Sequence, residues 1–374
     1  MFNCFIKQLN LLYKMTKVIF IGDPHFQISN IQEVNIFLER ITVLCEQTKP
    51  DIIVIAGDTL HTHERLHTVP LNKAYDLVNR MRTIAPTYVL VGNHDYQNNS
   101  QFLSDNHWLS GMKEWSNTYI VDRVLSLIIN NQKFIFVPYV SPQRFEEALN
   151  TIGDYWRDAN CIFCHQEFFG CKMGHIISTQ GDKWDLSYPE IISGHIHSNQ
   201  SPQKNIYYPG SAMQIAFGES EQNIIPILTF NDDLTYDKEE IDLKLPRKRI
   251  IYMDIDSVVD YVIPVEDEIE EHLRDKIKIT VTGLYDEFKA FKKTNKYKEI
   301  INYGIKIVFK PKIETDDENG KDSNENVDKI QNNIYNFNSI LTDLIMEQKN
   351  PYLIQAYDLI VNNNKMQMDD IMFL

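Results

Sequence analysis

The chain has 374 residues, of which 43% are hydrophobic and 24% are charged, a composition typical of a folded protein with two or three domains. Its formal net charge of −15 argues against a protein that coats nucleic acid non-specifically, but not against an enzyme whose phosphate contacts are local and assisted by cations. The five cysteines are an odd number and do not indicate a disulfide framework, and no apolar run approaches the roughly 18 residues of a membrane span. We therefore expect an intracellular protein, cytoplasmic or nuclear, that is neither secreted nor inserted in a membrane.

The first large domain is predicted over residues 16–243. Residues 1–15 read as an N-terminal extension, and Met15 is an alternative start because the strand-like run KVIFIG follows it closely. Short apolar runs then occur at residues 18–22, 52–57, 87–92, 133–139, 160–164 and 191–194. Amphipathic helices are predicted between the first three of them, over 31–47 and 70–85. This alternation predicts βαβ units and a layered α/β sheet with strands buried on both faces.

The remainder of the chain is predicted to contain a small domain and a tail. Residues 244–312 combine two alternating strands, 276–282 and 304–310, with a helical stretch between them, which indicates a small α+β domain. Residues 313–328 are polar and acidic, as in a disordered linker. Residues 329–374 carry apolar side chains at helical spacing, interrupted at Pro351, and predict a helix pair.

Polar side chains follow the predicted strands of the large domain at the points where those strands end. They are Asp23, His25, Asp58, Asn93, His94, Asp95, His165, His195 and His197. Asp58 follows Asp23 by 35 residues (58 − 23), and Asn93 follows Asp58 by 35 (93 − 58), one βαβ turn each. Since the carboxyl ends of parallel strands meet at one edge of a sheet, we expect these groups to converge on one crevice.

This donor set consists of carboxylate, carboxamide and imidazole groups without thiolate. Such donors suit Mn²⁺, Fe or Zn²⁺. There are too many donors for one ion, and a bridging carboxylate could hold two cations roughly 3.5–4 Å apart, as in two-metal phosphoryl-transfer centres. A single Asp or His after a strand is usually a turn or packing residue, but all of these motifs in order are not explained by coincidence.

Residues 161–165 read CIFCH, which allows three interpretations: haem attachment, a zinc cluster, or a strand with two packing cysteines. In a strand Cys161 and Cys164 point to opposite faces about 10 Å apart, too far to share an ion. The sequence therefore favours a buried strand in which only His165 is functional.

The order D-x-H, G-D, G-N-H-D, H and G-H-x-H resembles the calcineurin-like metallophosphoesterase superfamily, over about residues 16–220. The resemblance implies a layered β-sandwich flanked by helices, with the 244–312 unit as a cap domain. It implies one metal ion held by Asp23, His25, Asp58 and His197, and a second held by Asp58, Asn93, His165 and His195. It also implies that His94 contacts the phosphate and assists the leaving group, while Asp95 orients His94.

Within this superfamily the chain looks closest to the DNA nuclease subunits of double-strand-break repair, which pair with an SMC-like ATPase. GDTLH at residues 57–61 and NIYYPGSAMQIAFGE at 205–219 carry this likeness, whereas the G-D-x-x-D-R-G of protein phosphatases is absent. The likeness implies an exo- and endonuclease of recombination and repair that uses two divalent cations, Mn²⁺ first among them. It also implies a homodimer that docks its ATPase through the C-terminal helices.

Three further residues are candidates for substrate contact. His61 lies at the position of the family's substrate loop, and Lys292 and Lys293 belong to the lysine-rich segment 287–298, whose interleaved aromatic residues could meet a DNA backbone. A solvated face of a cap helix explains those lysines equally well. Two other functions stay open: a phosphomonoesterase or cyclic-nucleotide phosphodiesterase with the same metals, and a non-catalytic scaffold.

Overall fold

The computed structural model describes residues 15–63, 65–174, 176–231, 235–264, 273–312 and Ile345. The predicted linker and helix pair (313–374, Ile345 aside) and the extension before Met15 lie outside the described residues. The described residues up to Lys312 belong to one compact unit, which includes the predicted cap. No helix in the described part of the chain is long and apolar enough to cross a membrane.

The first of two six-stranded sheets contains the first three predicted strands, which pair in parallel and are extended by a parallel fourth strand and two antiparallel strands. In sheet order these are β14 (Tyr236–Ile241), β13 (Ile225–Phe230), β1 (Thr16–Ile21), β2 (Ile52–Ile55), β3 (Thr87–Leu90) and β4 (Thr118–Val121).

The second six-stranded sheet contains the other three predicted strands. Its order is β11 (Gln200–Gln203), β12 (Ile206–Tyr208), β10 (Glu190–Ser193), β7 (Cys161–Cys164), β6 (Gln132–Val137) and β5 (Leu125–Ile129). The four inner strands run parallel, and the edge strands β11 and β5 are antiparallel to their neighbours.

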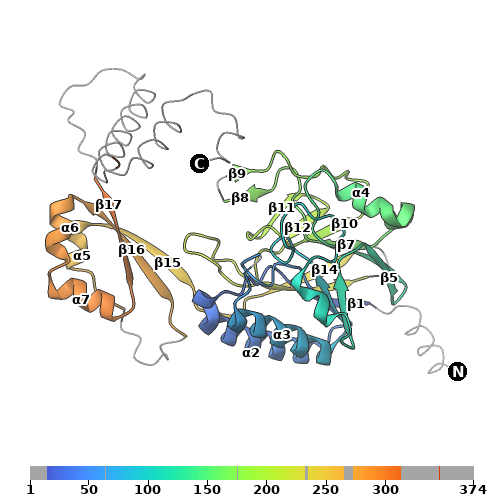
Figure 1. Cartoon of the computed structure of the whole chain (residues 1–374), viewed down its shortest axis with the longest axis horizontal. Helices are drawn as coiled ribbons and strands as arrows, with labels where there is room; N and C mark the ends of the chain where they lie inside the picture. The colour runs from blue at the N-terminus through green and yellow to red at the C-terminus, as the bar shows by residue number, and fades with distance from the viewer. Residues whose placement is uncertain are drawn as a thin grey trace, which may run out of the picture. The chain divides into compact units, whose positions relative to one another are not determined.

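The two sheets pack face to face, and helices cover their outer faces. Alternation along β1 sends Val18 and Phe20 into the layer between the sheets, together with Phe134 and Phe163 of the second sheet. Ile19 and Ile21 point instead toward the helical layer of α2 (Ile31–Thr48) and α3 (Thr68–Ile84), which lie side by side in Figure 1. On the outer face of the second sheet pack α4 (Phe145–Leu149) and the 3₁₀ segment η3 (Asn150–Trp156). The predicted layered α/β fold is confirmed.

Strand β7 contains the cysteines of the CIFCH segment and decides between the three interpretations of that segment. Cys161 packs between the two sheets and Cys164 packs on the opposite face. Both are free and fully buried, and burial raises the pKa of each thiol. The two cysteines are therefore packing residues, as strand geometry predicts.

The predicted cap segment forms a separate three-stranded sheet, whose strands all run parallel: β15 (Lys248–Asp254), β16 (Lys276–Gly283) and β17 (Lys306–Pro311). One face is covered by α5 (Ile255–Val259), α6 (Tyr285–Phe291) and α7 (Asn295–Asn302), which pack on the buried side chains of Ile279 and Val281 (Figure 1). Strand β15 is an addition to the two strands predicted from the sequence.

A two-stranded hairpin stands outside these sheets. It consists of β8 (Lys172–Met173) and β9 (Ile176–Ile177), which pair antiparallel, and all four side chains belong to exposed residues.

Candidate metal centre

The predicted polar residues gather where strands of both sheets end. Asp23 and His25 follow β1, Asp58 follows β2, and Asn93 opens the turn after β3. From the second sheet, His165 follows β7, and His195 and His197 follow β10. Residues separated by up to 174 positions (197 − 23) thus meet at one site, as the strand-end rule predicts.

One group of donor atoms surrounds His165. Its Nε2 lies 3.3 Å from Asp58 Oδ2 and 3.0 Å from Asn93 Oδ1. The Asn93 oxygen also lies 2.9 Å from Nδ1 of His195. Possible ligand atoms of Asp58, His165 and His195 lie within 4.8 Å of one another, which is close enough for one metal ion.

A second group surrounds His25. Its Nε2 lies 3.6 Å from Asp58 Oδ2 and 3.1 Å from His197 Nε2. Ligand atoms of Asp23, His25 and Asp58 again lie within 4.8 Å of one another. Asp58 belongs to both groups, so among the described residues it is the carboxylate placed to bridge two cations.

The side chains at this site are suited to divalent cations, and one observation shows this directly. The Oδ2 atom of Asp23 is buried in a residue that is fully inaccessible to solvent, and it has no hydrogen-bond partner among the described residues. An uncompensated buried carboxylate oxygen is costly, and coordination to a cation would compensate it. The donor set of carboxylate, carboxamide and imidazole is one that Mn²⁺, Fe and Zn²⁺ accept.

Electrostatics at the site are dominated by burial and by the two aspartates. Burial disfavours a charged His165, but the carboxylates of Asp58 and Asp23 outweigh it and raise the pKa of this histidine to about 9. Burial lowers the pKa of His195 to about 3 and raises that of Asp23. Burial also opposes ionisation of Asp58, yet its contacts with His165 bring its pKa below the usual range.

Four of the expected ligands have left-handed backbone conformations. The φ angles are 30° at Asp23, 47° at His25, 47° at Asp58 and 76° at His195. Such conformations are uncommon outside glycine, and in functional sites they accompany side chains that must point to a fixed place. Here they turn the chain sharply after the strand so that consecutive side chains reach the same crevice.

The glycines before the ligands are required by close approach. A Cβ on Gly92 would overlap the backbone nitrogen and Oδ1 of Asp58. A Cβ on Gly57 (φ 99°) would lie 2.8 Å from Nδ1 of His165. The G-D and G-N-H-D motifs therefore bring two strand-end turns into contact.

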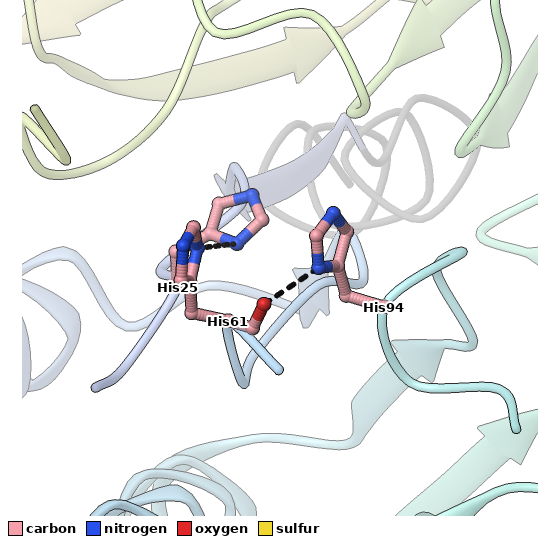
Figure 2. Close-up of side chains that lie close together, drawn as sticks. All are labelled: His25, His61 and His94. Atoms are coloured by element: carbon pink, nitrogen blue, oxygen red, sulfur yellow. Dashed lines mark hydrogen bonds between the residues drawn. The ribbon is translucent and has the colours of Figure 1, made fainter. Parts of the chain in front are cut away.

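His94 lies in a cluster of histidine rings (Figure 2). Its Nδ1 lies 2.7 Å from the carbonyl oxygen of His61, and since a carbonyl only accepts, Nδ1 carries the proton. The Nδ1 of His61 lies 3.3 Å from Nδ1 of His25. This arrangement leaves Nε2 of His94 without a partner in the described part of the chain.

The carboxylate of Asp95, to which the resemblance assigns the orientation of His94, makes no direct contact with the His94 imidazole among the hydrogen bonds of the described residues. Asp95 Oδ2 accepts hydrogen bonds from the backbone nitrogens of Gly92 (2.9 Å) and Asp58 (2.8 Å), and Oδ1 accepts one from Trp108 Nε1 (2.8 Å). Its carboxylate is thus occupied by groups other than the His94 imidazole, which the His61 carbonyl holds instead. Burial and then the charge of Asp58 raise the pKa of Asp95 to about 6.

Of the three candidates for substrate contact, the structure brings only His61 to the site. Lys292 and Lys293 are exposed at the end of α6 and are not among the residues that line the cleft described below. His63, in the same loop as His61, stacks on His94 with ring centroids 4.5 Å apart.

Glu219 and Trp108 were missed by sequence reasoning. Glu219 Oε1 lies 3.2 Å from Nδ1 of His197, and its Oε2 accepts hydrogen bonds from the backbone nitrogens of Ile215 (3.0 Å) and Ala216 (2.9 Å). The segment NIYYPGSAMQIAFGE (205–219) carries a likeness to repair nucleases but no other sign of a functional residue. No local pattern in it indicates that its glutamate reaches a histidine 22 positions earlier.

An open cleft of about 760 Å³ leads to the site. Asp58, Asn93, His94, His195 and His197 form its floor, and further residues of its lining include Lys172, Met173, Gln200 and Glu219. This volume falls in the range of ligand pockets and exceeds what a phosphate group alone needs.

A two-sheet α/β sandwich with paired donor groups at its strand ends defines a metal-dependent phosphoesterase. In agreement, residues 16–199 match the family described as calcineurin-like phosphoesterase. The chain belongs to this family of hydrolases, which use divalent metal ions.

Two viral proteins are similar over most of their length. The chain is 51% identical to "Putative phosphoesterase 244L" of Invertebrate iridescent virus 6 over 286 residues, which is 74% of this chain and 97% of that protein. It is 46% identical to "Putative phosphoesterase 078R" of Invertebrate iridescent virus 3 over 308 residues, 80% of this chain and 85% of that protein. Among solved structures, GAP50 of Plasmodium, the anchor in the inner membrane complex, matches with a TM-score of 0.37 and 12% identity, over 61% of this chain and 89% of that one.

Proposed function

We propose that the protein is a two-metal phosphodiesterase that hydrolyses DNA, as an exo- and endonuclease of the recombination and double-strand-break repair type. The observation that carries the proposal is the sharing of Asp58 between two groups of metal-ligand atoms at the floor of an open cleft. In this proposal one cation is held by Asp23, His25, Asp58 and His197, and the other by Asp58, Asn93, His165 and His195. Two bound divalent cations would lower the pKa of a water molecule and neutralise phosphate charge, with Mn²⁺ the first choice.

His94 is proposed to act on the leaving group. Its Nδ1–H is directed to the His61 carbonyl, so Nε2 is the atom available to the substrate in the cleft. When protonated, Nε2 can donate a proton to the departing oxygen. Asp95 acts indirectly, because its bonds to two backbone nitrogens fix the turns that carry Asp58 and His94.

The choice of DNA rests on the motif likeness and on the cleft. GDTLH and the Glu219 loop are the segments that resemble repair nucleases, and both lie at the site through His61 and Glu219. A small phosphomonoester or cyclic nucleotide as substrate remains the alternative, because the same metal site would hydrolyse either. A homodimer and an SMC-like ATPase bound by the C-terminal helices complete the proposal.

The decisive experiment compares substrates with purified protein and added Mn²⁺. We expect labelled linear duplex DNA to be degraded, and turnover of p-nitrophenyl phosphate, a monoester, to be far slower. Efficient turnover of the monoester with intact DNA would reject the nuclease in favour of the alternative.

Variants then test the assigned roles. Asp58→Asn should abolish activity and reduce the metal content, whereas His94→Ala should abolish activity with both cations still bound. Full nuclease activity in His94→Ala would exclude the leaving-group role. Deleting residues 313–374 should remove ATPase binding in a pull-down without removing metal.

A further inference from the structure

The hairpin formed by β8 and β9 contributes a lysine, Lys172, to the described lining of the cleft. Lys172, Met173 and Gly174 line the cleft with the floor residues, and neither another lysine nor any arginine occurs among its described lining residues. The Lys172 ammonium has no ion-pair partner in the part of the chain that the structure describes. In a chain of net charge −15, an unpaired lysine beside a site that is proposed to bind a phosphate needs an explanation.

Hydrogen bonds fix the base of this hairpin to the metal centre. The side chain of Gln200 accepts a bond from the Lys172 backbone nitrogen and donates one to the Lys172 carbonyl oxygen, both at 2.8 Å. Gln200 follows His197 by three positions, so the hairpin is tied to the segment that supplies a proposed metal ligand. Next to Lys172, Cys171 is buried and its carbonyl oxygen accepts a bond from Ser178 nitrogen at 2.8 Å.

The other three strand residues of the hairpin, Met173, Ile176 and Ile177, are apolar and exposed to solvent. The exposed fractions are 38% at Met173, 66% at Ile176 and 57% at Ile177. A positive group followed by apolar surface is suited to a nucleotide, since the ammonium pairs with a phosphate and the apolar side chain packs against the face of a base.

We propose that the β8–β9 hairpin binds the nucleotide next to the scissile phosphate, with Lys172 paired to its phosphate and Met173 packed against its base. This inference rests on the proposed function and deepens it, because it requires a substrate with at least two phosphates in a chain. The metal centre then performs hydrolysis, and the hairpin selects polynucleotides over small esters.

The test compares two diesters in wild type and Lys172→Ala. Bis(p-nitrophenyl) phosphate has one phosphate and no neighbour, and a labelled single-stranded octadeoxynucleotide has several. For the variant we expect KM for the octamer to rise about tenfold with kcat within a factor of about two, as the loss of one phosphate contact predicts, and the slope of log KM against log salt to fall by about 0.7. Kinetics with bis(p-nitrophenyl) phosphate should not change.

Lys183→Ala is the matched control, because Lys183 is exposed nearby but does not line the cleft. Lys172→Arg should restore most of the octamer affinity, and Met173→Ser should raise KM for the octamer several-fold with little effect on the salt slope. An unchanged octamer KM in Lys172→Ala, or an equal loss with both diesters, would overturn the inference while leaving the nuclease proposal intact. Wild-type protein that hydrolyses bis(p-nitrophenyl) phosphate but neither the octamer nor linear duplex DNA would reject both.

Discussion

Asp95 and Asp58 are joined through the backbone: Oδ2 of Asp95 accepts a hydrogen bond of 2.8 Å from the amide nitrogen of Asp58. The same oxygen accepts a bond from Gly92, so one buried carboxylate holds the turns after β2 and β3 together. The bridging position of Asp58 therefore depends on a side chain that is not among the proposed metal ligands.

The Asp95→Ala variant should lose stability and metal together. It leaves two buried backbone N–H groups without an acceptor, at a cost of roughly 1–3 kcal/mol each in the free energy of unfolding. Urea denaturation should show this loss, and metal analysis of the purified variant should show fewer cations. Asp95→Asn keeps one acceptor oxygen, so its free energy of unfolding should lie between those of wild type and Asp95→Ala. Equal stability of wild type and both variants would contradict the assigned contacts.

The Gly92→Ala variant should reduce the metal content without a change of ligand. Its Cβ would overlap the nitrogen and Oδ1 of Asp58, which must move away from the bridging position. Metal analysis and nuclease assays measure the effect. Gly111→Ala is the matched control, since a Cβ there meets no atom within 4 Å and should leave both properties unchanged.

Glu219→Ala should weaken the binding of one of the two cations. Glu219 holds His197 at Nδ1 and leaves Nε2 for the metal, and loss of such a partner typically costs 10–100-fold in affinity. Calorimetric titration with Mn²⁺ should show one weakened site and one unchanged site. Glu239→Ala, at an exposed position on β14, should bind Mn²⁺ like wild type. Identical titrations for the Glu219→Ala and Glu239→Ala variants would exclude the role of Glu219 in holding His197.

Acid should remove the stabilisation that Asp122 provides. Burial opposes its ionisation, but hydrogen bonds from His107 and Lys113 outweigh this and lower its pKa to about 2. A depressed carboxyl pKa stabilises the fold above the unfolded value of about 3.9, and this contribution disappears as the pH falls through about 2.

The difference in unfolding free energy between wild type and Asp122→Asn should therefore shrink by about 2 kcal/mol between pH 6 and pH 2. Urea denaturation at several pH values measures it. Asp105→Asn, at an exposed position, supplies the control for the change from a carboxylate to an amide. A difference for Asp122→Asn that does not depend on pH would contradict the role of the contacts that Asp122 makes with His107 and Lys113.

The sequence was sufficient to predict the six central strands and the convergence of their terminal residues. Buried strands such as β2 and β7 have a local signal, because every residue is apolar. Strands such as β14, with mostly exposed charged residues, have none and form by pairing with a neighbouring strand, here β13.

The partners of the site residues were harder to predict than the site residues themselves. The Asp95 contacts go to backbone nitrogens, which every residue has, and so leave no trace in the choice of side chains. The stacking of His63 on His94 depends on the path of a loop, which alternation of apolar residues does not encode.

The left-handed residues at the strand ends restrict how this site can change over generations. Outside glycine, asparagine, aspartate and histidine occur in this backbone region more often than other residues, and the positions concerned hold Asp23, His25, Asp58 and His195. A residue substituted there has to adopt the left-handed backbone conformation of the turn before its side chain can coordinate a metal ion. Backbone geometry and ligand chemistry thus accept nearly the same small set of amino acids, and a chain that lost its metal would still be expected to keep many of these residues.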